Sequence, residues 1–430
     1  MIKILSNPPR ESWKSLFRPA LTEKAGLEDK VRNILNRVRS EGDYALLDYS
    51  EKYDGVRPSG LRVSPEEIRE AGKYVPAELK EAINLARSNI EKFHASRLTE
   101  EPVIETTPGV KCWRKSIPVE RAGIYIPGGT APLFSTVLML AIPARIAGCR
   151  EVVMCTPPGS DGKVNPLILY AASVTGVTTV FMTGGAQAIA AMAFGTESVP
   201  KADKIFGPGN QYVTKAKEMI QMYGTPVDMP AGPSELLVIA DKTAIPEFIA
   251  ADLLSQAEHG PDSQVFLLSD DEEIIRQVKR EIEMQIHSLP RSGIAIRALE
   301  GSALILLSSV EECIDFSNLY APEHLIIATA EPSSVAGEVI NAGSVFLGNF
   351  SCESAGDYAT GTNHTLPTNG YARNYSGVSV ENFMKRISFQ EVTEEGIINI
   401  GPAVELMAEA EMLAGHRNAV TVRLKSLRNE

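Results

Sequence analysis

Short apolar runs alternate with helical patterns through most of the chain, and this alternation is the feature that most restricts the possible folds. The runs include AGIYIPGG, EVVMCTPP and TTVFMTGG, and later ELLVIA, SQVFLLS and SALILLS. Between them lie segments such as PLILYAASVTG and PEFIAADLLSQAEHG, whose apolar residues recur at helical spacing. Strand, helix and strand at these separations predict βαβ units and therefore parallel sheets.

The alternation occurs in two series, the second of which begins after residue 235, so we predict two α/β units. Before them the chain is typical of helices, and SPEEIREAGKYV has the pattern of a capping box, with Ser64, Pro65 and Glu67 at its start. Near the C-terminus, PAVELMAEAEMLAG predicts a helix. HRNAVTVRL follows it and alternates like a strand.

Charge and apolar content exclude several classes of protein. A formal net charge of −12 argues against nucleic acid and anionic membranes as partners, because both would repel the chain. The apolar start is interrupted by Asn7 and Pro8, which is not typical of a signal peptide. The stretch STVLMLAIPARIAGC contains Pro143 and Arg145 and is too short for a membrane span. Five dispersed cysteines without a CxxC pair indicate reduced thiols, so we expect a cytoplasmic protein.

Gln256 and His259, in SQAEHGPDSQ, form the first candidate site. On a helix, residues three apart lie on one face, so both side chains can reach a single point. An amide oxygen and an imidazole nitrogen are both suitable donors to Zn²⁺. The same spacing also occurs at an ordinary polar helix end that is closed by glycine, so both interpretations remain open at this point.

Glu323 and His324 form the second candidate, in YAPEHLIIATA, directly before an apolar run that predicts a strand. Ligands of open α/β sheets bind at loops that flank strand ends. There the carboxylate could activate a water molecule and the imidazole could move a proton near neutral pH. The alternative is a surface pair in a loop.

Two further segments near the C-terminus carry polar side chains. Residues 348–373, GNFSCESAGDYATGTNHTLPTNGYAR, predict a long loop that contains Asp357 and His364, and long polar loops inside compact domains are usually functional. AEMLAGHRNAV adds Glu411 and His416. The mixed nitrogen and oxygen donors of these segments suit Zn²⁺ or a similar divalent ion, although no spacing among them is diagnostic.

A separate site for a phosphate group is indicated by FGPGNQYVTKAKEM, where Gly207 and Gly209 precede a predicted helix. Tyr212 stands at the third glycine position, so the dinucleotide fingerprint GxGxxG is incomplete. These glycines could equally be ordinary turns between strand and helix.

Taken together, these motifs resemble the histidinol dehydrogenase family. Six motifs carry the likeness and follow the order of that family along the chain: GPGNQYV, AGPSE, SQAEHGPDSQV, APEHL, NFSCESAGDYATGTNHTLPT and HRNAVTVRL. The likeness runs from about residue 30 to residue 424. The resemblance implies oxidation of L-histidinol through an aldehyde to L-histidine with two NAD, the last steps of histidine biosynthesis. It also implies one zinc ion per subunit.

The resemblance assigns roles to individual residues. It implies that Glu323 and His324 are the catalytic acid–base pair. The implied metal ligands are Gln256, His259, Asp357 and His416. The implied substrate contacts are Ser234, Gln256, His259, His324, Asp357, His364, Glu411 and His416. The implied NAD contacts are Tyr125, Gln187 and Asn210.

The resemblance also implies an organisation of two Rossmann-like parallel-sheet domains, one inserted in the other, with helical N-terminal and small C-terminal extensions. We expect an N-terminal segment over residues 1–20. A discontinuous α/β domain over residues 21–124 and 236–375 would carry most of the metal and catalytic site. An NAD-binding domain over residues 125–235 would be inserted in it. Residues 376–430 would form a dimerisation arm that brings Glu411 and His416 to the partner's site in a homodimer.

Three alternatives remain. Aldehyde oxidation can proceed through a cysteine nucleophile, for which Cys112 and Cys352 are candidates, but neither has an adjacent histidine, and Glu353 would disfavour a thiolate at Cys352. A zinc-dependent hydrolase would share the His, Asp and Glu residues but would have no use for a nicotinamide site at residues 184–210. A non-catalytic metal-binding or assembly protein would show no turnover at all.

Overall fold

The computed structural model describes residues 2–17, 26–128, 131–230 and 232–428. The chain divides into two compact units, which we describe separately. The first comprises Met1–Ala95 and Glu120–Phe383 and contains two parallel sheets with helices around them. The second comprises Ser96–Val119 and Met384–Glu430. Among the described residues, no helix combines the length and apolar character needed to cross a bilayer.

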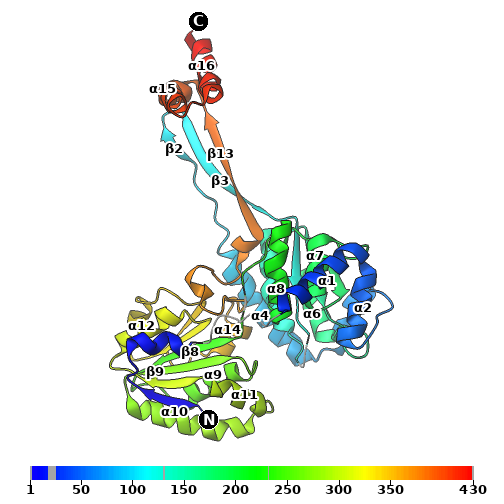
Figure 1. The fold of residues 1–430 in the computed structure, drawn as a ribbon, viewed down its shortest axis with the longest axis vertical. Coiled ribbons are helices and arrows are strands. Elements are labelled where there is room, and N and C mark those ends of the chain that lie inside the picture. Colours follow the sequence, from blue (N-terminus) through cyan, green and yellow to red (C-terminus); the bar gives the residue numbers. More distant parts are fainter. Residues whose placement is uncertain (1, 18–25, 129–130, 231, 429–430) are drawn as a thin grey trace. The chain divides into compact units, whose positions relative to one another are not determined.

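One parallel sheet of the first unit has four strands in the order β6-β5-β4-β7, as Figure 1 shows in cyan and green. The strands are β4 (Arg121–Tyr125), β5 (Glu151–Thr156), β6 (Thr179–Met182) and β7 (Lys204–Phe206). The helices between and after them are α5 (Phe134–Ala147), α6 (Pro166–Thr175), α7 (Gly185–Phe194) and α8 (Gln211–Ile220). This confirms the βαβ rhythm of the first series.

The other parallel sheet has six strands in the order β1-β10-β9-β8-β11-β12. They are β1 (Lys3–Ser6), β8 (Glu235–Ala240), β9 (Gln264–Ser269), β10 (Ala303–Leu306), β11 (His324–Ala328) and β12 (Ser344–Leu347). The accompanying helices are α9 (Pro246–Ala257), α10 (Glu272–Gln285), α11 (Ser292–Glu300), α12 (Val310–Tyr320), α13 (Pro332–Ala336) and α14 (Glu353–Tyr358). Every residue of β8, β9 and β11 is buried, which explains why these strands read as continuous apolar runs.

The N-terminal helices are α1 (Leu27–Glu41), α2 (Asp43–Asp54), α3 (Pro65–Glu70) and α4 (Ala77–Ala95). The capping box at Ser64 is present, since its hydroxyl accepts the N–H of Glu67 and the Glu67 carboxylate accepts the N–H of Ser64. His94, near the end of α4, is fully buried.

Two of these helices, α1 and α2, pack against helices of the four-stranded sheet. Ile34 of α1 and Leu46 of α2 lie in one hydrophobic core with Ile189 of α7 and Val213 of α8. The apolar faces of α1 and α2 therefore complete the hydrophobic core beside the four-stranded sheet. Near the N-terminus, β1 pairs in parallel with β10 and adds an edge strand to the six-stranded sheet.

The second unit is an antiparallel sheet in the order β13-β3-β2, with two helices. Its elements are β2 (Ile104–Thr107), β3 (Val110–Pro118), β13 (Met384–Val392), α15 (Glu394–Ala410) and α16 (Ala414–Arg428). The strand predicted for HRNAVTVRL is wrong, because this segment lies in α16. Val420 and Leu424 are four residues apart and both approach Gly401 of α15, so the apolar residues also fit a helical period.

Candidate functional site

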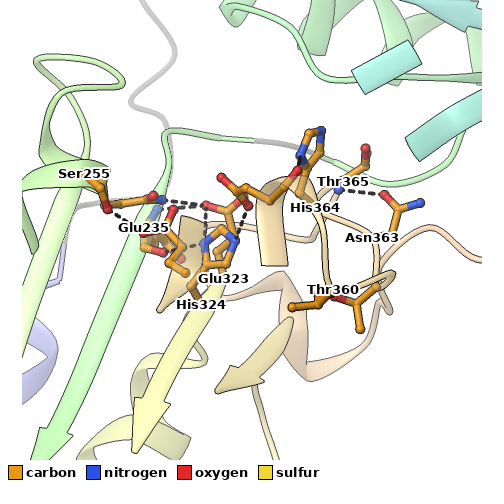
Figure 2. Close-up of polar contacts among 12 residues, drawn as sticks. Glu235, Ser255, Glu323, His324, Thr360, Asn363, His364 and Thr365 are labelled. Carbon is orange, nitrogen blue, oxygen red and sulfur yellow. Dashed lines mark hydrogen bonds and ion pairs between the residues drawn. The ribbon is translucent and has the colours of Figure 1, made fainter. Parts of the chain in front are cut away.

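The predicted catalytic pair lies where the amino ends of two neighbouring strands meet. Glu323 directly precedes β11, and Glu235 begins the adjacent strand β8. The C-terminal end of α9 brings Gln256 to the same edge of the sheet, and α14 supplies Asp357. Figure 2 shows Glu235, Glu323 and His324 close together at this edge. Ligands of open α/β sheets usually bind at the opposite, carboxyl edge, so this site depends on helix ends and loops.

The main chain of Glu235 holds both members of the pair. Its N–H donates to Glu323 Oε2 at 2.9 Å, and its carbonyl oxygen lies 3.2 Å from His324 Nδ1. Since a carbonyl only accepts, Nδ1 is the protonated nitrogen of His324, which leaves Nε2 for other chemistry. Glu323 and His324 are 8% and 3% exposed, so the alternative of a surface pair in a loop does not apply.

Asp357 lies on the other side of the His324 ring. Its Oδ1 is 3.6 Å from His324 Nε2, which is beyond hydrogen-bond range. Within the described part of the chain, both of these buried atoms lack a hydrogen-bond partner. His364 is nearby: its Nδ1 lies 2.9 Å from the main-chain oxygen of Asp357, and its Nε2 lies 3.3 Å from the Thr136 hydroxyl.

The amide of Gln256 lies between Glu323 and Glu353. With its nitrogen towards Glu353 the amide donates to that carboxylate, and its oxygen accepts the N–H of Glu235 at 3.0 Å. In the opposite orientation the nitrogen is 3.3 Å from Glu323 Oε2. The first orientation gives each amide atom a complementary partner, so the surrounding groups favour it. The Ser255 hydroxyl donates to Glu353 Oε2 at 3.3 Å.

The electrostatics of this cluster are dominated by buried carboxyl groups. Burial raises the pKa of Glu323 to about 7 and that of Glu353 to about 8. Burial by itself lowers the pKa of His324, but the carboxylates of Glu323 and Asp357 raise it to about 10. Burial would raise the pKa of Asp357, but the neighbouring His324 lowers it below its ordinary value. A cluster with more acids than cations is a favourable place for a bound cation.

The chemistry of the donors fits a divalent metal ion. Ligand atoms of His324, Glu353 and Asp357 all lie within 4.8 Å of one another, and two of them are the unpartnered atoms described above. Gln256 is 1% exposed beside them. His259 is exposed at the end of the same helix, and its charge acts on Asp357. Of the four predicted metal ligands, Asp357 belongs to this cluster and Gln256 contacts its Glu353.

The remaining predicted residues lie in two places. Ser234 is half-buried and directly precedes Glu235. Glu411 caps the end of α15 and His416 lies on α16, and both are exposed in the second unit. The cysteine candidates are also separate, because Cys352 precedes α14 in the first unit whereas Cys112 lies on β3 in the second.

Two acids in this site, Glu235 and Glu353, were not identified from the sequence as functional residues. Each was visible only as a neighbour of another candidate, Ser234 or Cys352. Their burial, at 7% and 1% exposed, is the property that marks them, and no spacing in the sequence predicts it.

A cavity of about 830 Å³ lies at the carboxyl ends of the four-stranded sheet. All three predicted NAD contacts, Tyr125, Gln187 and Asn210, line it. The Tyr125 hydroxyl accepts the N–H of Gly185 at 2.9 Å, and burial raises the pKa of Tyr125 to about 12. The helices α7 and α8 both begin beside this cavity, in the position where parallel sheets bind nucleotides.

Gly207, at the end of β7, is expected to resist substitution. Its φ is 127°, and a Cβ built there would lie 2.2 Å from the main-chain oxygen of Tyr125. We expect Gly207→Ala to lower the free energy of unfolding by about 3 kcal/mol, because it adds a backbone clash to an unfavourable φ. Gly224→Ala is the control, since Gly224 has a φ of 86° but no described atom within 4 Å of its built Cβ. Equal losses in denaturant unfolding would contradict the clash.

Comparison with known proteins gives one family. The family model described as histidinol dehydrogenase matches residues 18–424. A histidinol dehydrogenase from Bacteroides fragilis is 55% identical over 99% of this chain and 100% of its own length. The one from Bacteroides thetaiotaomicron is 55% identical over the full length of both chains. The crystal structure of histidinol dehydrogenase from Elizabethkingia anophelis is 57% identical, covers 99% of each chain and has a TM-score of 0.97. The chain therefore belongs to the histidinol dehydrogenase family of oxidoreductases.

Proposed function

We propose that the protein oxidises L-histidinol through L-histidinal to L-histidine, with two NAD as hydride acceptors and one zinc ion per subunit. The observation that carries the proposal is the buried Glu323–His324 pair, whose Nε2 is directed at Asp357 and has no hydrogen-bond partner among the described residues. Family membership supports the substrate, and the cavity lined by Tyr125, Gln187 and Asn210 supports the dinucleotide. The free thiols are compatible with our proposal that the enzyme is cytoplasmic.

His324 is the proton acceptor in both oxidations. Its Nδ1–H is held by the carbonyl of Glu235, which leaves Nε2 as the basic atom. A cation that neutralised Asp357 would lower the pKa of His324 from about 10, and the neutral ring then takes the hydroxyl proton of the alcohol at Nε2 as the hydride leaves. The same atom takes a proton from the hydrated aldehyde in the second oxidation. The carboxylate of Glu323, whose Oε2 lies 3.6 Å from Nδ1, stabilises the imidazolium that forms in the first oxidation.

Glu323 supplies the water chemistry between the two oxidations. One of its oxygens is fixed by the N–H of Glu235 at 2.9 Å. Burial raises its pKa above the ordinary range of a carboxyl group, which makes it a stronger base towards water. It takes a proton from the water molecule that adds to the aldehyde carbonyl, while the His324 imidazolium returns its proton to the carbonyl oxygen. This gives the hydrate and leaves His324 neutral for the second oxidation.

Gln256, His259 and Asp357 of one subunit, together with His416, are the residues that would hold the metal ion. When bound, the ion would neutralise the charge of Asp357 and orient the imidazole and amine of histidinol. Since His416 and Glu411 are exposed in a separate unit, we propose that the C-terminal arm completes the site of the partner subunit in a homodimer. Exposed Leu406, Met407 and Met412 of that unit support its burial in an interface.

The direct test of the function is the stoichiometry of the reaction. Purified protein supplied with L-histidinol and excess NAD is expected to form two NADH and one L-histidine for each histidinol consumed. A zinc hydrolase or a non-catalytic metal protein would form no NADH. One NADH with accumulation of the aldehyde would refute the second oxidation.

Glu353→Gln is expected to weaken metal binding by about 10–100-fold, because outer partners that orient a ligand have effects of this size. Glu353 accepts from the amide of Gln256 and so directs the amide oxygen of that ligand. Competition with a chromophoric chelator measures the affinity. Asp252→Asn is the control. Asp252 is a buried carboxyl on α9, one turn before Gln256, and it contacts the main chain of Glu353. Equal affinities for both variants and the parent would contradict the role of Glu353.

Cys352→Ala is expected to leave the rate of histidinal oxidation within about a factor of two, since the water mechanism needs no covalent thiohemiacetal. The rate is measured with histidinal and NAD in the steady state. Selective loss of this second oxidation, with histidinol still oxidised to the aldehyde, would revive the cysteine route. Cys112→Ala serves as the matched control.

A further inference from the structure

A buried ion pair lies beside the turn that joins β7 to α8, away from the catalytic pair. Lys217 Nζ is 2.5 Å from Asp228 Oδ1, and the two side chains are 4% and 0% exposed. Lys217 lies on α8, whereas Asp228 lies beyond the end of that helix, in a segment that runs beside β7. Replacing such a pair by apolar side chains often leaves stability unchanged or improves it, so a gain in stability is a weak explanation for its presence.

Both charges bind the main chain of the same residue, Gly207. Lys217 Nζ donates to the carbonyl oxygen of Gly207 at 2.8 Å, and the N–H of Gly207 donates to Asp228 Oδ2 at 2.8 Å. Asp228 Oδ1 also accepts the N–H of Met229 at 2.8 Å. The pair therefore holds Gly207 from its N–H and from its C=O, which fixes the direction in which the chain leaves β7.

The held residue begins the turn that forms one wall of the cavity. Three residues after Gly207, the Asn210 side chain accepts the N–H groups of Tyr212 at 3.0 Å and Val213 at 3.2 Å and so caps α8. Asn210 and Tyr212 both line the cavity. A change in direction at Gly207 would move both of these groups.

We propose that Lys217 and Asp228 are positioning residues that hold the turn of residues 207–210 in the conformation that binds a nicotinamide dinucleotide. This inference rests on the proposed function for the identity of the ligand. A rigid turn lowers the conformational cost of binding, so its loss reduces affinity for the dinucleotide without touching the proton chemistry at His324.

The test compares Lys217→Met with Arg121→Met in the full-length protein. Arg121 is another ion-paired cation, and it lies on β4 at the amino edge of the four-stranded sheet, away from the cavity. It pairs with Glu151 at 2.7 Å and donates to the main-chain oxygen of Lys201 at 2.9 Å. Lys217→Met is expected to fold, because two main-chain N–H groups still satisfy Asp228.

The readouts are the NADH dissociation constant by fluorescence titration, KM for NAD, KM for histidinol, and kcat. Lys217→Met is expected to raise the NADH dissociation constant and KM for NAD by about tenfold or more, with kcat at saturating NAD and KM for histidinol within about twofold. Arg121→Met is expected to leave all four within about twofold. Asp228→Asn, which keeps the shape of the side chain, is expected to follow Lys217→Met.

Unchanged NADH affinity in Lys217→Met and Asp228→Asn would overturn the inference, as would equal effects of Lys217→Met and Arg121→Met. Failure of the parent protein to bind NADH would instead refute the proposed cofactor. In that case hydrogen exchange at the amides of residues 207–213 still tests whether the ion pair holds the turn. Faster exchange in Lys217→Met supports this role, and unchanged exchange refutes it.

Discussion

Glu323→Gln is expected to lower the rate of L-histidinal oxidation by about 10²–10⁴-fold, the usual contribution of a positioned general base. The substitution removes the basic carboxylate but retains an oxygen that can accept the N–H of Glu235, so the local structure is expected to persist. The rate is measured with histidinal and NAD in the steady state. Oxidation of histidinol to the aldehyde, followed in a single turnover, is expected to fall far less, because His324 and not Glu323 takes that proton.

Two controls keep this result interpretable. Metal content and histidinol affinity of Glu323→Gln are expected to match the parent protein, which separates loss of the base from loss of the site. A variant that retains metal and oxidises histidinal at the parent rate would show that another group activates the water. Equal loss of both oxidations would place Glu323 in the alcohol step as well.

Asp357→Ala and His416→Ala are each expected to abolish turnover as pure proteins, yet a mixture of the two is expected to recover activity. If each site combines Asp357 of one subunit with His416 of the partner subunit, a mixed dimer contains one intact site. Random reassortment makes half of all dimers mixed, so recovery of about a quarter of the parent activity is expected. The measurement is NADH formation after the two variants are unfolded and refolded together.

The matched control pairs Asp357→Ala with a double variant that carries Asp357→Ala and His416→Ala. No dimer in that mixture has an intact Asp357, so no recovery is expected. If the mixture of the two single variants also fails to recover although mixed dimers form, the site is completed within one chain and the shared-site proposal is incorrect.

The general architecture was accessible from the sequence because buried parallel strands are short, apolar and separated by helical segments. ELLVIA and SQVFLLS were predicted as strands, and both form strands that are fully buried. The packing of α1 and α2 was not accessible, because an amphipathic helix shows which face is apolar but not which lobe covers that face. The C-terminal segment HRNAVTVRL failed for a related reason, since its apolar residues fit both a strand period and a helix period.

In the candidate site, too, relations set by local helix spacing could be predicted from the sequence, whereas relations set by tertiary packing could not. Gln256 and His259 could be paired from their spacing alone, because a helix sets their relation locally. The prediction that they meet Asp357, about one hundred residues later, rested on resemblance, since only the tertiary fold determines such a contact. Glu235 and Glu353 were missed because a carboxyl group on a strand or a short helix is usually exposed, and only the packing around these two makes them buried partners of the site.

The most direct test of the central claim is the dependence of histidinol oxidation on a bound divalent ion. The protein as purified is expected to contain about one zinc ion per chain, to lose NADH formation when a chelator removes the ion, and to regain it with one equivalent of added zinc. Metal content and NADH formation are measured on the same samples. Full histidinol oxidation by protein shown to be metal-free would contradict the claim that Gln256, His259 and Asp357 hold a cation that the reaction requires.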